Sequence, residues 1–192
     1  MLSIPSLGVL NGHPSPLPRW RGPFPLAWAI REGDTDLGLT YHLMDETFDT
    51  GPILAQGSLP MPAIFEWEAL QPALVGLAQE LMPKALDRLA RGECGEPQTG
   101  NGPYAGRFPA AFAELDLSLP AAVVHRHVAS WRFIFLHDGE RGPLATVAGA
   151  RTRIVRTSLE DPGDGLPALV CADGPLWVLE SEPVEPKEAS AR

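Results

Sequence analysis

Prolines and glycines divide this chain into short segments from one end to the other. The sequence has 21 prolines and 19 glycines among 192 residues, and they lie in small clusters rather than in one low-complexity tract. Such clusters mark turns between the short elements of a folded chain. The hydrophobic fraction of 44% and the charged fraction of 20% agree with a globular protein and exclude a disordered one. The length allows one large domain or two small ones.

The charge of the chain argues against a polyanionic partner. Fifteen basic and 24 acidic residues leave a formal charge of −9, so the chain as a whole does not attract a nucleic-acid backbone. No apolar run approaches the ~20 residues of a membrane-spanning helix, and the first residues lack the basic segment of a secretory signal. We therefore expect no membrane partner and a cytoplasmic location. Cys94 and Cys171 are expected to be reduced thiols without a catalytic role.

The first half of the chain alternates between strand and helix patterns. We predict a strand at 6–10, a helix at 26–32, strands at 37–44 and 52–59, and a helix at 67–91. Pro72 and Pro83 are expected to break or kink the last helix, and Gly92 to end it. This order is typical of an α/β domain, which we place at residues 1–92.

The second half begins after a segment rich in Gly and Pro, residues 93–110, which we interpret as a linker. Ser118 is expected to cap a helix that begins near Ala121. The segments that follow are β-rich and separated by turns, which suggests a compact barrel over residues 111–184. Its expected strands are 132–136, 143–149, 151–159, 167–172 and 175–181. Residues 185–192 have the composition of a disordered tail.

Three polar side chains could carry chemistry in the first domain. Asn11 and His13 follow the first predicted strand, and Asp49 follows the next. In an open α/β sheet, loops at the carboxyl ends of neighbouring strands converge on one crevice. An amide can donate to an oxyanion, an imidazole can move a proton, and a carboxylate can orient the imidazole. No serine stands between glycines as a nucleophile would, which favours direct attack by an amine on an acyl donor. From spacing alone, ordinary turns explain these residues equally well.

Several separated runs resemble the folate-dependent formyltransferase family. They are Asn11-Gly-His13-Pro-Ser-Pro-Leu-Pro-Arg-Trp-Arg-Gly22, Trp28-Ala-Ile, Thr40-Tyr-His-Leu-Met-Asp45 and Phe48-Asp49-Thr50-Gly51-Pro-Ile-Leu54. The resemblance is dense over residues 7–59 and weaker over 118–184, where it points to the family's C-terminal, OB-like barrel domain. It implies an α/β fold with a partial Rossmann-like formyltransferase sheet, followed by a small C-terminal OB-like β-barrel.

The resemblance also implies roles for individual residues. Asn11 would donate to the formyl oxygen, His13 would share that task or move a proton, and Asp49 would hold His13 and accept the proton of the amine. The loop from Ser15 to Gly22 would lie along the donor, 10-formyltetrahydrofolate, and the amine. The residues expected to bind folate are Ser15, Pro16, Leu17, Pro18, Arg19, Arg21 and Gly22. No metal is implied.

Two departures from the family stand out. Pro16 replaces a residue that is usually leucine, which stiffens the loop. In addition, family members have a Rossmann-like half before the Asn-x-His strand, whereas Met1 lies ten residues before Asn11 here. We therefore expect a fragment, a remnant, or a chain completed by a partner or by a second copy, since the strand edge beside residues 7–10 would be unpaired.

Other polar residues have simpler interpretations. His42 is expected to pack or hydrogen-bond within a strand, and Asp45 and Glu46 to be solvated or to support the site. Arg19 and Arg21 could bind the glutamate tail of folate or an acidic acceptor, or be solvated. His125 and His127 would differ by about 200° around a helix, so they cannot share a metal ion.

The acceptor follows from charge rather than from the resemblance. Arg151, Arg153 and Arg156 could contact RNA, but residues 105–192 carry nine basic and 12 acidic side chains. We therefore expect formyl transfer to a small primary amine, with methionyl-tRNA as a possible acceptor that the charge disfavours. The alternatives are a formyl-folate hydrolase and a non-catalytic remnant.

Overall fold

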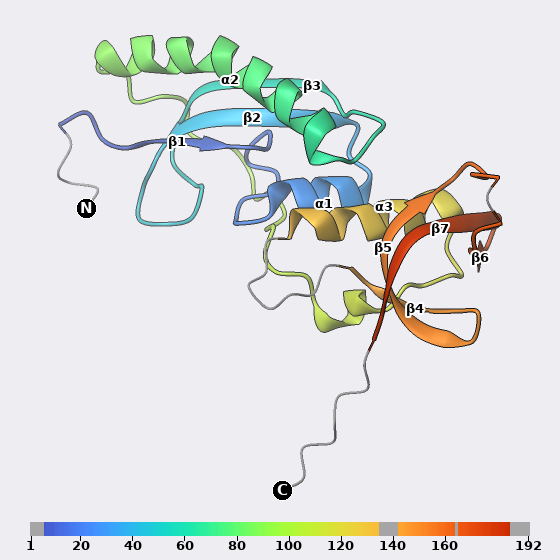
Figure 1. Ribbon diagram of the computed structural model, residues 1–192. Coiled ribbons are helices and arrows are strands. Elements are labelled where there is room, and N and C mark those ends of the chain that lie inside the picture. Colours follow the sequence, from blue (N-terminus) through green and yellow to red (C-terminus); the bar gives the residue numbers. More distant parts are fainter. Residues whose placement is uncertain (1–5, 135–141, 164, 185–192) are drawn as a thin grey trace, which may run out of the picture. The chain divides into compact units, whose positions relative to one another are not determined.

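A computed structural model describes residues 6–134, 142–163 and 165–184. The chain divides into two compact units, Met1–Arg107 and Phe108–Arg192, which we describe separately. The first unit contains a three-stranded sheet and two helices (Figure 1). Its elements are β1 (Leu10–His13), α1 (Pro25–Glu32), β2 (Asp36–Leu43), β3 (Ile53–Pro60) and α2 (Trp67–Ala90).

The sheet of the first unit is antiparallel, which corrects our expectation about how the site forms. Its strand order is β1-β2-β3, and both neighbouring pairs run antiparallel. The expected strand at 6–10 begins only at Leu10, after Gly8 with φ of 83°. Asn11 and His13 therefore lie within a strand rather than in a loop after it. The residues beside Asn11 and His13 are therefore those that pair with them across β1 and β2, and not residues of loops that converge at strand ends.

Alternation along β2 gives the sheet one apolar and one polar face. Leu39 and Tyr41 pack against α2, which runs along this face of the sheet (Figure 1). Thr40 and His42 point to the opposite face because successive side chains of a strand alternate. The core between α2 and the sheet contains Leu39, Tyr41, Leu54, Leu77, Leu81 and Ala85.

Helix α2 continues through both of its prolines, so the predicted break does not occur. Pro72 and Pro83 lie inside the 24-residue helix, and both are exposed to solvent. A proline removes one N–H donor, but on the solvent side the freed carbonyl can bind water. Gly92, with φ of 73°, ends the helix as predicted: its N–H donates to Leu89 O and the next N–H to Arg88 O.

The segment expected to be a linker belongs to the first unit up to Arg107. Ile53 and Glu96 exchange backbone hydrogen bonds, and Ala105 N donates to Arg21 O. Trp28 Nε1 donates to Gly106 O at 2.7 Å. These hydrogen bonds, together with Ala105, which is buried in a cluster with Trp20 and Ala29, attach the segment. The division between units therefore falls after Arg107.

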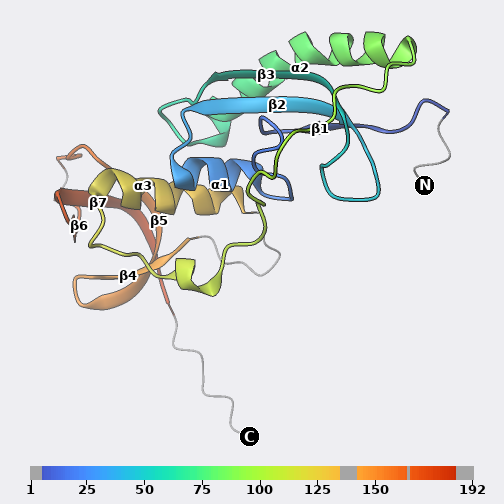
Figure 2. The same ribbon diagram turned by 180° about the vertical axis from the view of Figure 1, so that it is seen from behind.

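The second unit consists of α3 (Ala121–Ser130) and a four-stranded antiparallel sheet (Figure 2). Its strands are β4 (Leu144–Val147), β5 (Ala150–Ser158), β6 (Ala168–Cys171) and β7 (Gly174–Pro183), in the order β4-β5-β7-β6. Two short 3₁₀ helices, η1 (Ala110–Ala113) and η2 (Trp131–Phe133), flank α3. Across the described residues the sheet is open rather than a closed barrel.

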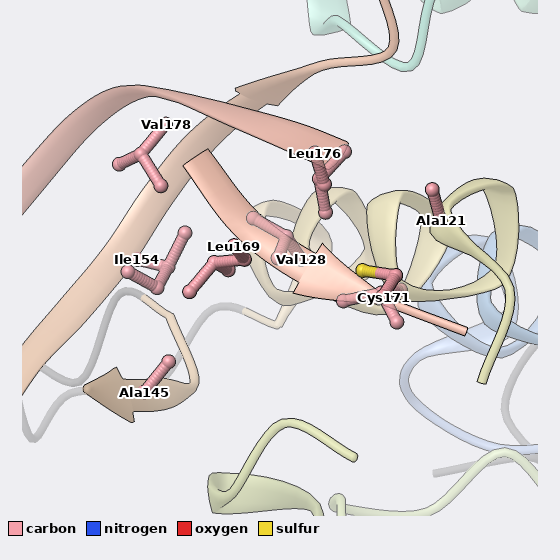
Figure 3. Close-up of a cluster of buried hydrophobic side chains, with 9 residues drawn as sticks. Ala121, Val128, Ala145, Ile154, Leu169, Cys171, Leu176 and Val178 are labelled. Atoms are coloured by element: carbon pink, nitrogen blue, oxygen red, sulfur yellow. The ribbon is translucent and has the colours of Figure 1, made fainter. Parts of the chain in front are cut away.

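The core of the second unit lies between α3 and this sheet. Val128 of α3 meets Ile154, Leu169 and Leu176 of three strands (Figure 3). Buried Cys171 lies in the same cluster, which agrees with a thiol that has a packing role.

Two local predictions for the second unit are wrong. Residues 132 and 133, expected to start a strand, belong to the 3₁₀ helix η2, and residues 135 and 136 of that strand lie outside the described residues. Ser118 bonds to Asp116 and does not cap α3. Instead, Asp173 accepts a 2.6 Å hydrogen bond from Ala121 N. An acidic side chain from elsewhere in the unit thus replaces the local cap. The tail at 185–192 also lies outside the described residues.

Candidate active site

The register of β1 and β2 brings the polar residues of the first unit together. Asn11 pairs with His42 and His13 with Thr40, and partners directly opposite share one face of a sheet. Gly12 alternates to the other face, where the Tyr41 ring lies 3.0 Å from the position that a Cβ would take. A larger residue between Asn11 and His13 would therefore require the Tyr41 ring to shift.

Asp49 reaches the same point from the loop between β2 and β3. Its Oδ1 accepts a hydrogen bond from Asn11 Nδ2 at 3.3 Å, and its Oδ2 accepts one from Gly22 N at 2.8 Å. Its backbone has φ of 56°, a left-handed conformation that Asp tolerates better than most residues. The side chain is 14% exposed, so the carboxylate is largely withdrawn from water but remains accessible.

His13 is held in a defined tautomer. Its Nε2 lies 2.8 Å from Trp20 O, and because a carbonyl only accepts, Nε2 carries the proton. Its Nδ1 faces Asp49 Oδ2 at 3.6 Å. Burial lowers the pKa of His13 below 6.5, against the opposing effects of the Trp20 carbonyl and Asp49. His13 is therefore neutral near pH 7, with the lone pair of Nδ1 directed at Asp49.

His42 completes the cluster, although the sequence predicted only packing or hydrogen bonding within a strand for it. It is 1% exposed, and its Nε2 lies 3.2 Å from Asn11 Nδ2 and 3.5 Å from Asp49 Oδ1. The expectation that it hydrogen-bonds within the sheet is confirmed, but its partner is a candidate catalytic residue. The strand register carries this contact, so a correct pairing of β1 with β2 would have revealed it.

The loop expected to bind folate turns several of its side chains inward. Ser15 and Leu17 are buried, and Ser15 Oγ donates to Arg19 O at 2.7 Å. Thr40 Oγ1 donates to Ser15 O at 2.7 Å, and Gln56 Nε2 donates to Leu17 O at 2.8 Å. Ser15 and Leu17 therefore shape the loop from inside, and sequence alone did not distinguish them from the half-buried Pro16 and Pro18.

Both arginines of this loop are already engaged. Arg19 makes a two-pronged contact with Asp34, at 2.7 and 2.5 Å, and the Trp20 indole donates to the same carboxylate. Arg21 donates twice to Gln98 Oε1, at 2.9 and 2.7 Å. These contacts favour a structural role over binding of a glutamate tail. Gly22 serves the site through its N–H, which donates to Asp49.

Gln98 is a further residue of the site, and the sequence did not single it out. Its Nε2 donates to Asp49 O and Gly51 O, both at 2.8 Å, while its Oε1 accepts from Arg21. One amide thus ties the backbone of the Asp49 loop to the loop that contains Gly22. Since the segment 93–110 looked like a linker, no sequence signal pointed to this contact.

We expect Gln98→Leu to destabilise the unit by about 1–2 kcal/mol, because two backbone carbonyls and a guanidinium lose a partly buried hydrogen-bond partner. Catalytic turnover is expected to fall about tenfold, since Asp49 loses its anchor. Chemical denaturation and steady-state kinetics measure the two effects. Gln71→Leu, at an exposed position on α2, is the matched control. A Gln98→Leu protein as stable as the control would contradict this role.

The acidic residues that precede Asp49 differ in their environment. Asp45 Oδ1 accepts from Thr47 N at 3.0 Å and from Thr50 Oγ1 at 2.7 Å, so it organises the loop that presents Asp49. Glu46 is exposed. Of the two interpretations given for Asp45, support of the site is the one that the structure favours.

The described part of the second unit offers no comparable cluster. His125 Nδ1 lies 2.8 Å from Thr157 Oγ1. Across β5 and β7, Arg153 stands opposite Glu182 and Arg156 opposite Glu180, so carboxylates accompany the arginines. Among the residues that the structure describes, no three His, Cys, Asp or Glu side chains are grouped to hold a metal ion. No helix in the described part of the chain is long and apolar enough to cross a membrane.

Comparison with known proteins bears on the family of the chain. Residues 1–86 match the family model described as formyl transferase. A methionyl-tRNA formyltransferase of Pelobacter propionicus is 34% identical over 197 residues, which cover 94% of this chain and 58% of the relative. One of Chloroflexus aurantiacus is 36% identical over 200 residues, covering 99% of this chain and 64% of the relative. The chain thus spans less than two thirds of the length of these curated relatives.

A solved structure shows the same fold. The N-formyltransferase of Helicobacter canadensis, in complex with folinic acid and dTDP-3-aminofucose, aligns with a TM-score of 0.66 and 19% identity. The alignment covers 91% of this chain and 66% of that one.

These matches confirm the resemblance to the formyltransferase family that the motifs predicted. Within that family it resembles the methionyl-tRNA formyltransferases.

Proposed function

We propose that this protein transfers a formyl group from 10-formyltetrahydrofolate to a primary amine. The observation that carries the proposal is the meeting of Asn11, His13 and Asp49 at one partly accessible point. The polar types match what acyl transfer to an amine requires, and a folate derivative is bound to the related N-formyltransferase. The half-buried Pro16 and Pro18 and the exposed Arg19 would form the part of the loop that lies along the folate.

The proton balance of the site supports this chemistry. Neutral His13 directs the Nδ1 lone pair at Asp49 Oδ2, 3.6 Å away. A proton taken up by Asp49 would therefore lie between two acceptors. The attacking amine loses one proton as its nitrogen bonds to the formyl carbon, and Asp49 accepts this proton and shares it with His13. The donor nitrogen takes up one proton as its bond to the formyl carbon breaks, so the protons of the reaction balance.

Asn11 supplies the electrostatic part of the proposal. Its Nδ2 donates to Asp49 Oδ1 and lies beside His42, so the amide is next to the carboxylate that would accept the proton. A formyl oxygen placed against this amide would receive a hydrogen bond as negative charge develops on it. The donor, 10-formyltetrahydrofolate, would supply the activated formyl carbon.

The acceptor is proposed to be a small primary amine. The net charge of −9 and the carboxylates opposite Arg153 and Arg156 oppose binding of a polyanion. Methionyl-tRNA is the second candidate, because the curated relatives bear the name of that activity. The related N-formyltransferase holds an aminosugar nucleotide, which is a small amine.

We also propose that the two units correspond to parts of a formyltransferase. Residues 1–107 would form the part of the catalytic domain that contains the polar cluster. The helix and antiparallel sheet of the second unit would be the counterpart of the OB-like domain, with four described strands in place of a closed barrel.

The test supplies the full chain with 10-formyltetrahydrofolate and, in separate reactions, a panel of amino acids and aminosugar nucleotides or methionyl-tRNA. Mass spectrometry is expected to detect a formylated small amine, at a rate that exceeds formylation of methionyl-tRNA. Release of formate without an amine would instead identify a formyl-folate hydrolase. Calorimetry that shows no affinity for folinic acid would overturn the proposal and favour a non-catalytic remnant.

A further inference from the structure

We infer that His42 is a positioning residue that sets the orientation of the Asn11 amide. This inference rests on the proposed function for its catalytic meaning, but the geometry behind it is independent of the reaction. His42 stands opposite Asn11 in the β1–β2 register and is 1% exposed. A buried imidazole at this point can exchange hydrogen bonds only with the few groups that face it.

The tautomer of His42 follows from the groups that face its two ring nitrogens, with Asp49 Oδ1 also 3.5 Å from Nε2. Its Nδ1 lies 2.9 Å from Leu43 O, and since the carbonyl only accepts, Nδ1 carries the proton. In the neutral ring, Nε2 then has a lone pair, which lies 3.2 Å from Asn11 Nδ2. His42 is therefore an acceptor for Asn11. His13 has the opposite tautomer, because its Nε2 is the nitrogen that faces a carbonyl.

Together His42 and Asp49 select one of the two orientations of the Asn11 amide. Both groups present acceptors to the same nitrogen, at 3.2 and 3.3 Å. If the amide turned over, its oxygen would face the Asp49 carboxylate and the His42 lone pair, and all three groups would be acceptors. The NH₂ group of Asn11 is thus directed into the site and its oxygen away from these two partners.

The hydrogen bonds from Asn11 Nδ2 to Asp49 and to His42 differ in strength. The bond to Asp49 has an ionised acceptor, so it is the stronger one. Both distances are longer than the usual 2.9–3.0 Å of such bonds, so the N–H on His42 is held weakly. His42 thus keeps this N–H oriented until a formyl oxygen replaces the imidazole as its acceptor.

Selective isotope labelling can test the orientation without any assay of activity. The chain has two asparagines, Asn11 and the exposed Asn101, so ¹⁵N-asparagine labelling gives two side-chain NH₂ signals with an internal reference. We expect the Asn11 signals to exchange slowly with water and ring ¹⁵N spectra to show His42 protonated at Nδ1. Finding His42 protonated at Nε2 in the neutral protein would overturn the inference.

Variants at His42 separate positioning from packing. His42→Gln places an amide oxygen where it can accept from Asn11, whereas His42→Leu fills the space without an acceptor. We expect His42→Leu to shift the Asn11 signals and remove their protection, and His42→Gln to restore both. His127→Leu in the second unit is the control, and should leave the Asn11 signals in place. Unchanged Asn11 signals in folded His42→Leu would refute the role.

The catalytic consequence is measured on the same proteins. His42→Leu is expected to lower kcat about tenfold to a hundredfold with little change in KM for the amine, and His42→Gln to recover most of the loss. If neither the parent nor any variant forms a formylated amine while the amide signals behave as expected, the proposed function fails and the positioning role stands. If His42→Leu turns over as fast as the parent, the positioning role has no catalytic meaning and fails.

Discussion

Asn11→Ala is expected to lower kcat/KM for formyl transfer about a hundredfold or more. Removal of one donor to a developing oxyanion typically costs ~3 kcal/mol of transition-state stabilisation. Asn11 is the one side-chain amide in the cluster of Asn11, His13, His42 and Asp49, and its Nδ2 lies at the edge of that cluster. The loss should fall mainly on kcat, because the bond to the formyl oxygen strengthens only as charge develops.

The matched control for this variant is Asn101→Ala, which truncates the only other asparagine at an exposed site. Circular dichroism should show both variants folded, since Asn11 lies near the end of a four-residue strand and contributes no core packing. Full turnover by folded Asn11→Ala would remove the amide from the reaction.

The sequence predicted the local elements of the first unit well and their arrangement poorly. Alternation along residues 37–44 and the glycines after each helix depend on neighbouring residues, so β2, α1 and the end of α2 were predictable. The direction of β1 relative to β2 depends on contacts between distant residues. The expectation that the site forms where loops at the carboxyl ends of neighbouring strands converge was therefore wrong, although the three candidate residues do meet.

The same limit explains which site residues the sequence missed. Asn11, His13 and Asp49 stand in runs whose chemistry is visible from residue type alone. His42 becomes part of the site through strand register, and Gln98 through a segment whose composition suggested a linker. Conversely, Ser15 and Leu17 belong to a recognisable motif but face the interior. A motif identifies a loop, but packing decides which of its side chains a ligand can reach.

Asp49→Asn is expected to have the largest effect, a loss of about a thousandfold in kcat/KM. The substitution keeps the size of the side chain, and Asn tolerates the left-handed backbone at φ of 56°. The amide oxygen can still accept from Gly22 N, so the loop should keep its place. The variant loses the group that accepts the proton of the amine, and general-base catalysis contributes about 10²–10⁴-fold.

The pH profile distinguishes loss of the base from a change in structure. Burial lowers the pKa of His13, and the charge of Asp49 partly offsets this by raising it. Since His13 must be neutral to share the proton, activity of the parent should decline only below pH 6.5. Without Asp49 the pKa of His13 falls further, so the acid limb of the residual activity should move to lower pH.

The control is Glu46→Gln, which removes an exposed carboxylate from the same loop and should change neither rate nor profile. A limb that moves to higher pH, or a folded Asp49→Asn with the parent's rate, would show that the carboxylate does not act on His13 and that the proton leaves by another route.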